Sequence, residues 1–81
     1  MDYCLVVFAS ATTVNRVKSV LKRKLNIESE IVQTPGALPA DGCSYSLRIK
    51  LGDVDRVWTI VKNSNLSSKG VFRESDFRKL K

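Results

Sequence analysis

The chain has 81 residues, of which 43% are hydrophobic and 27% charged, and its formal net charge is +6. The length supports one small domain, and the composition is typical of a globular protein and excludes a disordered, collagen-like or coiled-coil chain. The charge favours an anionic partner of unspecified class, and the absence of histidine removes the commonest general base and metal ligand.

The first third of the chain predicts a strand followed by a helix. Residues 3–9 form an apolar run, which indicates a central strand. The hydroxyls of Ser10, Thr12 and Thr13 supply N-caps, so we expect a helix that begins near Thr12 or Thr13 and ends at Asn26. Its apolar stripe consists of Val14, Val17, Val20, Leu21 and Leu25.

Residues 28–34 and 43–50 predict two further strands, joined by a loop rich in proline and glycine. In the second of these strands, clean alternation assigns Tyr45, Leu47 and Ile49 to a buried face. The solvent-facing side then carries Ser44, Ser46, Arg48 and Lys50. One face of this strand is therefore expected to pack against the core, and the other to lie on the open, solvent-exposed face of the sheet.

The remaining sequence predicts a second helix, a short strand and a tail. Asp53 is the expected N-cap of the helix, which we expect to end near Asn63 to Asn65. Its core stripe consists of Val54, Val57, Trp58 and Val61. A strand around 70–73 follows. We expect residues 1–75 to form the single domain and residues 76–81 to be a charged, frayed tail.

The order β-α-β-β-α-β predicts an α+β fold of the ferredoxin-like split type. Right-handed crossovers interleave its two halves into a four-stranded antiparallel sheet with both helices on one face. The third strand then lies beside the first and antiparallel to it, so its beginning lies near the end of the first strand. This fold hosts many unrelated functions, and the function must therefore be argued from a site.

Cys43 is the residue to which this topology gives a chemical role. It precedes the third strand and is expected beside the N-terminus of the first helix, which favours an anion. A thiol in such a place has a lowered pKa and more thiolate at neutral pH. Ser10, Thr12 and Thr13 add hydroxyl donors, and Gly42 removes a side chain next to the sulfur. The alternative is that Cys43 is only a small residue at a strand edge.

The other candidate residues have structural as well as functional interpretations. Cys4 lies in the apolar first strand and is expected to pack as a small hydrophobe. Two thiols without histidine cannot form a zinc site, and we expect neither a metal nor a cofactor. Arg48 and Lys50 are candidate contacts for an anion or a partner chain, or are simply solvated. The same two interpretations apply to the basic residues of the first helix, Lys18, Lys22 and Arg23.

Nucleic-acid binding and a membrane span are not expected. The signature of RNA-recognition modules is missing, and the one aromatic of the third strand, Tyr45, is assigned to the helix-covered face. No apolar run approaches the ~20 residues that a span requires. No secretory signal precedes the first strand, so we expect a cytoplasmic protein.

Three stretches carry a family resemblance. They are Val6-Val7-Phe8-Ala9-Ser10 with the threonine-rich helix start, Ile31-Val32-Gln33-Thr34-Pro35, and Gly42-Cys43-Ser44-Tyr45-Ser46-Leu47-Arg48-Ile49. Over residues 3–74 the chain resembles the DUF3343 family of small selenium/sulfur carrier-like proteins. The resemblance implies a cytoplasmic carrier, and the cysteine that matches is Cys43. Many members have Ser-Ser-Cys-Gly where this chain has Asp41-Gly42-Cys43-Ser44, and a carboxylate at Asp41 opposes thiolate formation.

These observations favour a non-enzymatic carrier that holds sulfane sulfur or selenium on the Cys43 thiolate, with a donor and an acceptor protein as partners. The alternative is an interaction or regulatory module that binds a small anion or a protein and in which Cys43 is incidental. Such a module could form a homodimer through the open sheet face or an edge strand. An enzyme is disfavoured, because the sequence has no histidine and no paired carboxylates in a predicted cleft.

Overall fold

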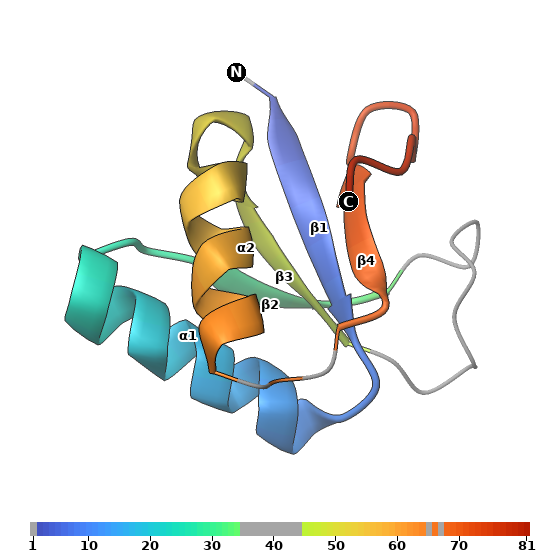
Figure 1. The fold of residues 1–81 in the computed structure, drawn as a ribbon. Coiled ribbons are helices and arrows are strands. Elements are labelled where there is room, and N and C mark those ends of the chain that lie inside the picture. The colour runs from blue at the N-terminus through green and yellow to red at the C-terminus, as the bar shows by residue number, and fades with distance from the viewer. Residues whose placement is uncertain (1, 35–44, 65, 67) are drawn as a thin grey trace.

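A computed structural model describes residues 2–34, 45–64, 66 and 68–81. Its elements in chain order are β1 (Tyr3–Phe8), α1 (Ala11–Leu25), β2 (Glu30–Gln33), β3 (Tyr45–Lys50), the 3₁₀ turn η1 (Leu51–Asp53), α2 (Val54–Asn63) and β4 (Gly70–Arg73) (Figure 1). Neither helix of the described chain is long and apolar enough to cross a membrane.

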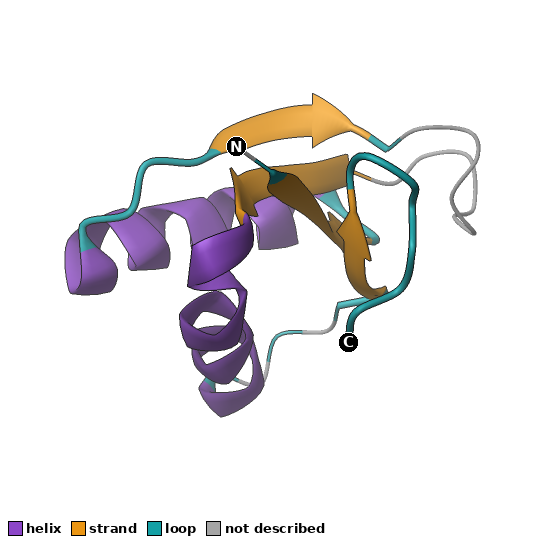
Figure 2. Ribbon diagram, turned by 90° about the horizontal axis from the view of Figure 1, so that it is seen from above, coloured by secondary structure: helices purple, strands orange, loops and turns teal. Residues whose placement is uncertain are grey.

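The four strands form one antiparallel sheet in the order β2-β3-β1-β4. β1 lies in the centre and pairs with β3 and β4, while β2 pairs with the outer side of β3. Both helices lie against the same face of this sheet (Figure 2). The prediction of a ferredoxin-like α+β fold is therefore confirmed.

The main core lies between the sheet and the helices. Alternate residues of β1, namely Cys4, Val6 and Phe8, meet the buried stripe of each helix there. These stripes are Val14, Val17 and Leu21 in α1, and Val54, Val57 and Val61 in α2. Trp58 is only partly buried and packs at the margin of this core. The helical periodicity of the sequence thus predicts which side of each helix faces the sheet.

The ends of α1 follow from its capping residues. The helix begins at Ala11, earlier than expected, because Ser10 is the N-cap and its hydroxyl accepts a hydrogen bond from the Thr13 N–H at 3.2 Å. It ends where expected, at Asn26, whose N–H donates to the Lys22 carbonyl at 3.1 Å. The left-handed conformation of Asn26 then turns the chain so that the Ile27 N–H donates to the Leu21 carbonyl at 3.2 Å.

Asp53 does not cap α2 with its side chain, contrary to expectation. The turn η1 places Asp53 in a helical conformation, whereas a capping side chain requires an extended one. Its carboxylate pairs with Arg56 instead.

The sheet face away from the helices is also buried, which the alternation of β3 did not predict. Leu5, Val7 and Phe72 are only 2%, 1% and 4% exposed, and Phe77 from beyond β4 packs against them. Ser46, expected to face solvent, lies on this face and is fully buried. Alternation separates the two faces of a strand but does not reveal that a distant segment covers one of them.

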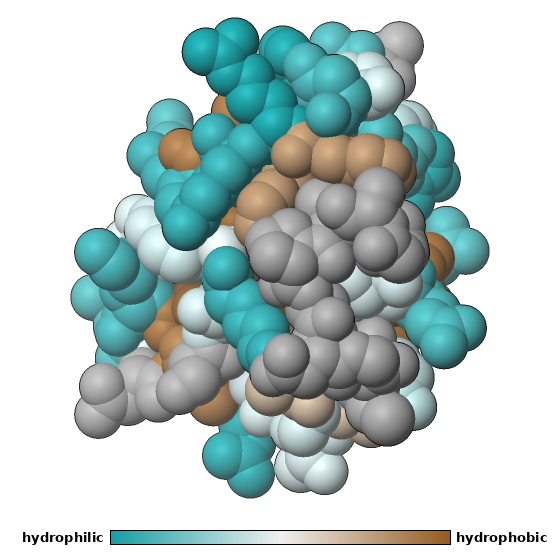
Figure 3. Space-filling model, turned by 90° about the vertical axis from the view of Figure 1, so that its right-hand side faces the viewer, coloured by the Kyte–Doolittle hydropathy of each residue, from teal (hydrophilic) through white to brown (hydrophobic). Residues whose placement is uncertain are grey.

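Residues 76–81, expected as a frayed tail, fold back along β4. The Leu80 N–H donates to the Val71 carbonyl at 2.7 Å, and the Arg73 N–H donates to the Arg78 carbonyl at 2.9 Å. Asp76 accepts hydrogen bonds from the Arg73 side chain and from the Arg78 N–H, which lower the pKa of its carboxyl to about 2. Figure 3 views the molecule from the side on which β4 and the residues after it lie. Hydrophilic side chains dominate the described part of that surface.

Candidate functional site

Several connections of the chain meet at one end of the sheet, which we call the loop end. Here the last residue of β1, Phe8, pairs with the first residue of β3, Tyr45. Tyr45 also pairs with Gln33, the last residue of β2. On the other side of β1, Val7 pairs with Gly70 at the start of β4 (Figure 1). The predicted proximity of the beginning of β3 to the end of β1 is therefore correct.

The N-terminus of α1 belongs to the loop end, because Ser10 follows Phe8 by two positions. The Ser10 and Thr13 hydroxyls lie 2.9 Å apart, and the Thr13 N–H donates to Ser10. The N–H groups of Ala11 and Thr12 have no acceptor within the described part of the chain, as is usual in a first helical turn. These two groups can donate hydrogen bonds to an anion. Thr13, predicted as a donor to the thiolate, shares these hydrogen bonds with Ser10, and its predicted role stays a prediction because Cys43 lies outside the described residues.

The residues on both sides of the 35–44 segment are fixed to each other. The hydroxyls of Thr34 and Ser46 form a hydrogen bond of 2.8 Å, and Ser46 is fully buried between Val7 and Val32. Gly42 and Cys43 lie in residues 35–44, outside the described residues. The structure thus defines the base from which this segment leaves and re-enters the sheet, at the loop end.

Tyr45 and Ser68 are loop-end residues that sequence reasoning missed. Tyr45 was assigned to the core by alternation, but it is 39% exposed because it stands at the very start of its strand. The one sequence feature that pointed to this exposure is the position of Tyr45 beside a loop rich in proline and glycine. The Ser68 hydroxyl donates to the Val7 carbonyl at 2.9 Å and accepts from the Gly70 N–H at 3.1 Å. No sequence pattern indicated that role.

Arg48 and Lys50 lie toward the opposite end of β3, so they do not join the loop end. The Arg48 guanidinium binds both oxygens of Glu74, at 2.7 and 3.0 Å, and lies 3.9 Å from the centre of the Tyr3 ring. The hydrogen bonds with Arg48 lower the pKa of Glu74 and raise that of Arg48. Arg48 therefore links β3 to the segment after β4, whereas Lys50 is exposed.

Cys4 is a structural residue, as predicted. It is fully buried in the helix-side core and pairs with Ile49, away from the loop end. Burial raises the pKa of its thiol, which the nearby Arg73 only partly offsets. Such a thiol is a poor nucleophile. No cluster of three or more potential metal-ligating side chains occurs among the residues with described positions.

Comparison with known proteins gives one match. The model of a family described as "Putative Se/S carrier protein-like" matches residues 3–73. Neither the curated proteins nor the solved structures contain a match.

Proposed function

The chain belongs to this Se/S carrier protein-like family, and we propose that it is a non-enzymatic carrier that holds sulfane sulfur or selenium on Cys43. The observation that best supports the proposal is the pairing of Phe8 with Tyr45. Tyr45 follows Cys43 by two positions, and Phe8 leads directly into the N-terminus of α1. The residue two positions after the thiol therefore pairs with the strand end that leads to the N–H groups of Ala11 and Thr12. These groups have no acceptor among the described residues, and such donors favour a thiolate.

The proposed transfer is an exchange at sulfur. The Cys43 thiolate attacks the terminal sulfur of a persulfide on a donor protein, and a new S–S bond forms at Cys43. The S–S bond of the donor breaks, and the donor cysteine leaves as a thiolate. No electrons are gained or lost overall. A terminal selenium atom is transferred in the same way, and an acceptor thiolate reverses the process.

This chemistry requires an ionised, accessible thiol and a docking surface rather than a general base. The absence of histidine from the chain is compatible with that requirement. A cytoplasmic location is part of the proposal, because a reducing compartment keeps the unloaded thiol reduced.

The direct test is mass spectrometry after incubation of the reduced protein with glutathione persulfide. We expect the mass of one added sulfur atom at Cys43 and no addition in Cys43→Ser. Cys4 serves as an internal control, because it is buried and its thiol has a raised pKa. Absence of the adduct from Cys43, or equal labelling of both cysteines, would refute the carrier role.

A second experiment tests whether the helix terminus activates the thiol. We expect Thr12→Asp to raise the pKa of Cys43 by about half a unit, because the new carboxylate competes for the same N–H groups and repels a thiolate. The rate of alkylation at Cys43 as a function of pH gives this pKa.

Ser19→Asp is the matched control for that experiment. Ser19 is exposed on the same helix but lies about two turns further along, where the field of the helix terminus has faded. Its substitution should leave the pKa of Cys43 unchanged. If both variants shift the pKa equally, the effect is one of net charge and the helix terminus plays no special part.

A further inference from the structure

The excess positive charge of the chain is concentrated on α1. This helix has five basic residues and no acidic one: Arg16, Lys18, Lys22, Arg23 and Lys24. All five are exposed. Basic residues near the end of a helix stabilise it through the helix dipole, but that explanation does not extend to Arg16, which lies in the first half.

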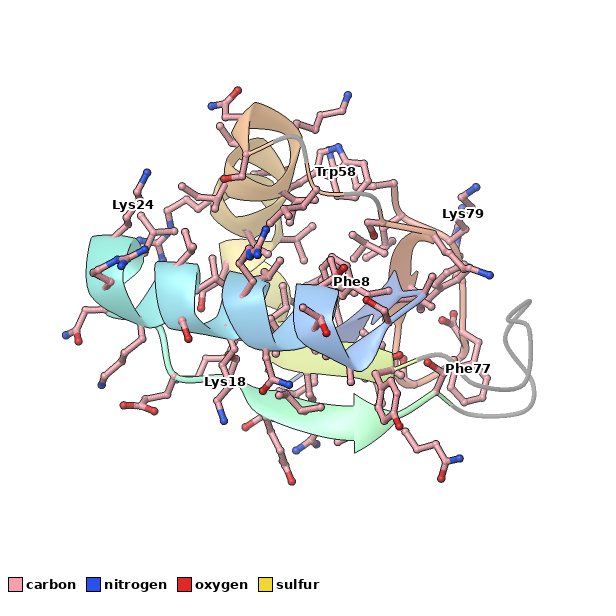
Figure 4. The ribbon with its side chains drawn as sticks, turned by 90° about the horizontal axis from the view of Figure 1, so that it is seen from below. Phe8, Lys18, Lys24, Trp58, Phe77 and Lys79 are labelled. Carbon is pink, nitrogen blue, oxygen red and sulfur yellow. The ribbon has the colours of Figure 1, made fainter. Side chains whose placement is uncertain are left out.

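Fewer of the basic residues on α1 than of those outside it form ion pairs with acidic residues. Pairs with acidic residues hold Arg48, Arg56, Arg73 and Lys81. Within the described ranges α1 makes one ion pair, between Lys22 and Glu28. Lys22, and to a smaller extent Lys18, lower the pKa of Glu28, so both cations face that acid. Lys24 extends from the other side of the helix than Lys18 (Figure 4).

Arg16, Arg23 and Lys24 have no acidic partner in the part of the chain that is described, and we call them the basic surface of α1. Arg16 and Arg23 are seven positions apart, which is about two helical turns, and therefore lie on the same side. That side is away from Val17 and Leu21, which are buried against the sheet. The basic surface thus faces outward along much of the helix.

An apolar groove lies at the end of α1, where its lining residue Leu25 directly follows Lys24 of the basic surface. Its volume is about 300 Å³, and its lining residues are Leu25, Asp55, Arg56, Thr59 and Ile60. Leu25 and Ile60 are partly buried against the core, so the floor of the groove is apolar. The carboxylate of Asp55 is held by Lys81 at 3.3 Å. An apolar side chain therefore fits this groove beside Lys24 at the end of α1.

We propose that the basic surface and this groove together dock an acidic protein segment, one apolar side chain of which enters between Leu25 and Ile60. The proposal rests on the proposed function, since the segment would belong to the sulfur or selenium donor or acceptor. α1 has 15 residues, a length of about 22 Å. A partner that lies along the helix therefore reaches the loop end.

A protein segment fits this surface better than a nucleic acid or a membrane. The exposed large hydrophobic side chains of the described residues are Tyr45 and Leu51, and neither is on α1. The helix therefore offers no aromatic platform for bases and no large apolar side chain for insertion into a bilayer. Charge complementarity with an acidic surface, together with one apolar anchor, is a common basis of protein recognition.

The test measures binding of a fluorescein-labelled peptide made of repeated Glu-Glu-Leu triplets. We expect salt-sensitive binding that the triple variant Arg16→Glu, Arg23→Glu, Lys24→Glu weakens about ten-fold or more. The control variant Lys50→Glu, Lys62→Glu, Lys79→Glu changes the net charge equally and should weaken binding much less.

A second peptide, with serine in place of leucine, tests the groove. We expect Ile60→Thr to weaken binding of the leucine peptide and to leave binding of the serine peptide unchanged.

Equal weakening by both triple variants would overturn the proposal, because binding would then follow net charge alone. It would also be overturned if oligo(dT) or phosphatidylglycerol vesicles bind more tightly than the peptide and with the same sensitivity to the α1 variant. Persulfide formation with glutathione persulfide is measured on every variant. If the unaltered protein forms the persulfide but does not bind the peptide, this inference alone is contradicted. If it binds the peptide but forms no persulfide at Cys43, the carrier function alone is contradicted.

Discussion

Replacement of Phe8 by alanine should lower the free energy of unfolding by about 3–5 kcal/mol. Phe8 lies in the helix-side core and is the largest fully buried side chain among the described residues. Alanine removes its apolar contacts and leaves a cavity between the sheet and the helices. Small domains have about 5–15 kcal/mol of stability in total, so this one substitution removes a large part of it. Urea denaturation followed by far-UV circular dichroism measures the loss.

Leu51→Ala is the matched control for Phe8→Ala. Leu51 is also a large hydrophobic residue, but it is 39% exposed in the turn η1. Its truncation should change the free energy of unfolding by about 0.5 kcal/mol or less. Similar losses in the two variants would show that the core does not depend on Phe8 as the structure indicates.

The helices and the order of the strands could be predicted from sequence because their signals are local. Val14, Val17 and Leu21 recur at helical spacing, and all three are buried. Once the order of elements is known, chain connectivity and handedness leave few arrangements of the sheet. The same reasoning placed the start of β3 beside the end of β1, which the pairing of Phe8 with Tyr45 confirms.

The covered second face of the sheet could not be predicted, because it depends on contacts between distant parts of the chain. Arg48 looked like a solvent-facing cation, yet it binds Glu74, which lies 26 positions away. Phe77 lies in a charged stretch that resembles a frayed terminus, and it packs on Leu5 and Val7 from the other end of the sequence. No periodic pattern signals either contact.

The candidate site was predicted in outline but not in detail. Topology alone placed the helix N-terminus and the beginning of β3 together. The roles within the first turn depend on which hydroxyl caps the helix, and Ser10, Thr12 and Thr13 are all chemically suited to that role. The structure selects Ser10, whose hydroxyl accepts a hydrogen bond from the Thr13 N–H, and among the described residues the N–H groups of Ala11 and Thr12 have no acceptor.

Substitution of Gly70 by alanine should destabilise the domain by about 1–3 kcal/mol. Gly70 has a φ of +126°, a conformation that residues with a side chain rarely adopt. It opens β4 opposite Val7 at the loop end. A Cβ there would also lie 3.1 Å from the Lys81 carbonyl oxygen, because the C-terminal residues fold back along β4. Urea denaturation measures the expected loss.

Gly52→Ala provides the control, since a Cβ at Gly52 would have no atom within 4 Å and its φ is not positive. This variant should be neutral or more stable by about 0.4–1 kcal/mol, because alanine restricts the unfolded chain. If both glycine variants behave alike, backbone strain at Gly70 is not the cause of its effect.

Deletion of Lys81 separates the two causes that act at Gly70. If the close approach of the Lys81 carbonyl dominates, Gly70→Ala should cost much less in the shortened chain than in the full one. If the backbone conformation dominates, the cost should be the same in both. We expect the second result, because a φ of +126° is unfavourable for any residue with a side chain, and the start of β4 is held by its pairing with β1 and by the Ser68 hydroxyl.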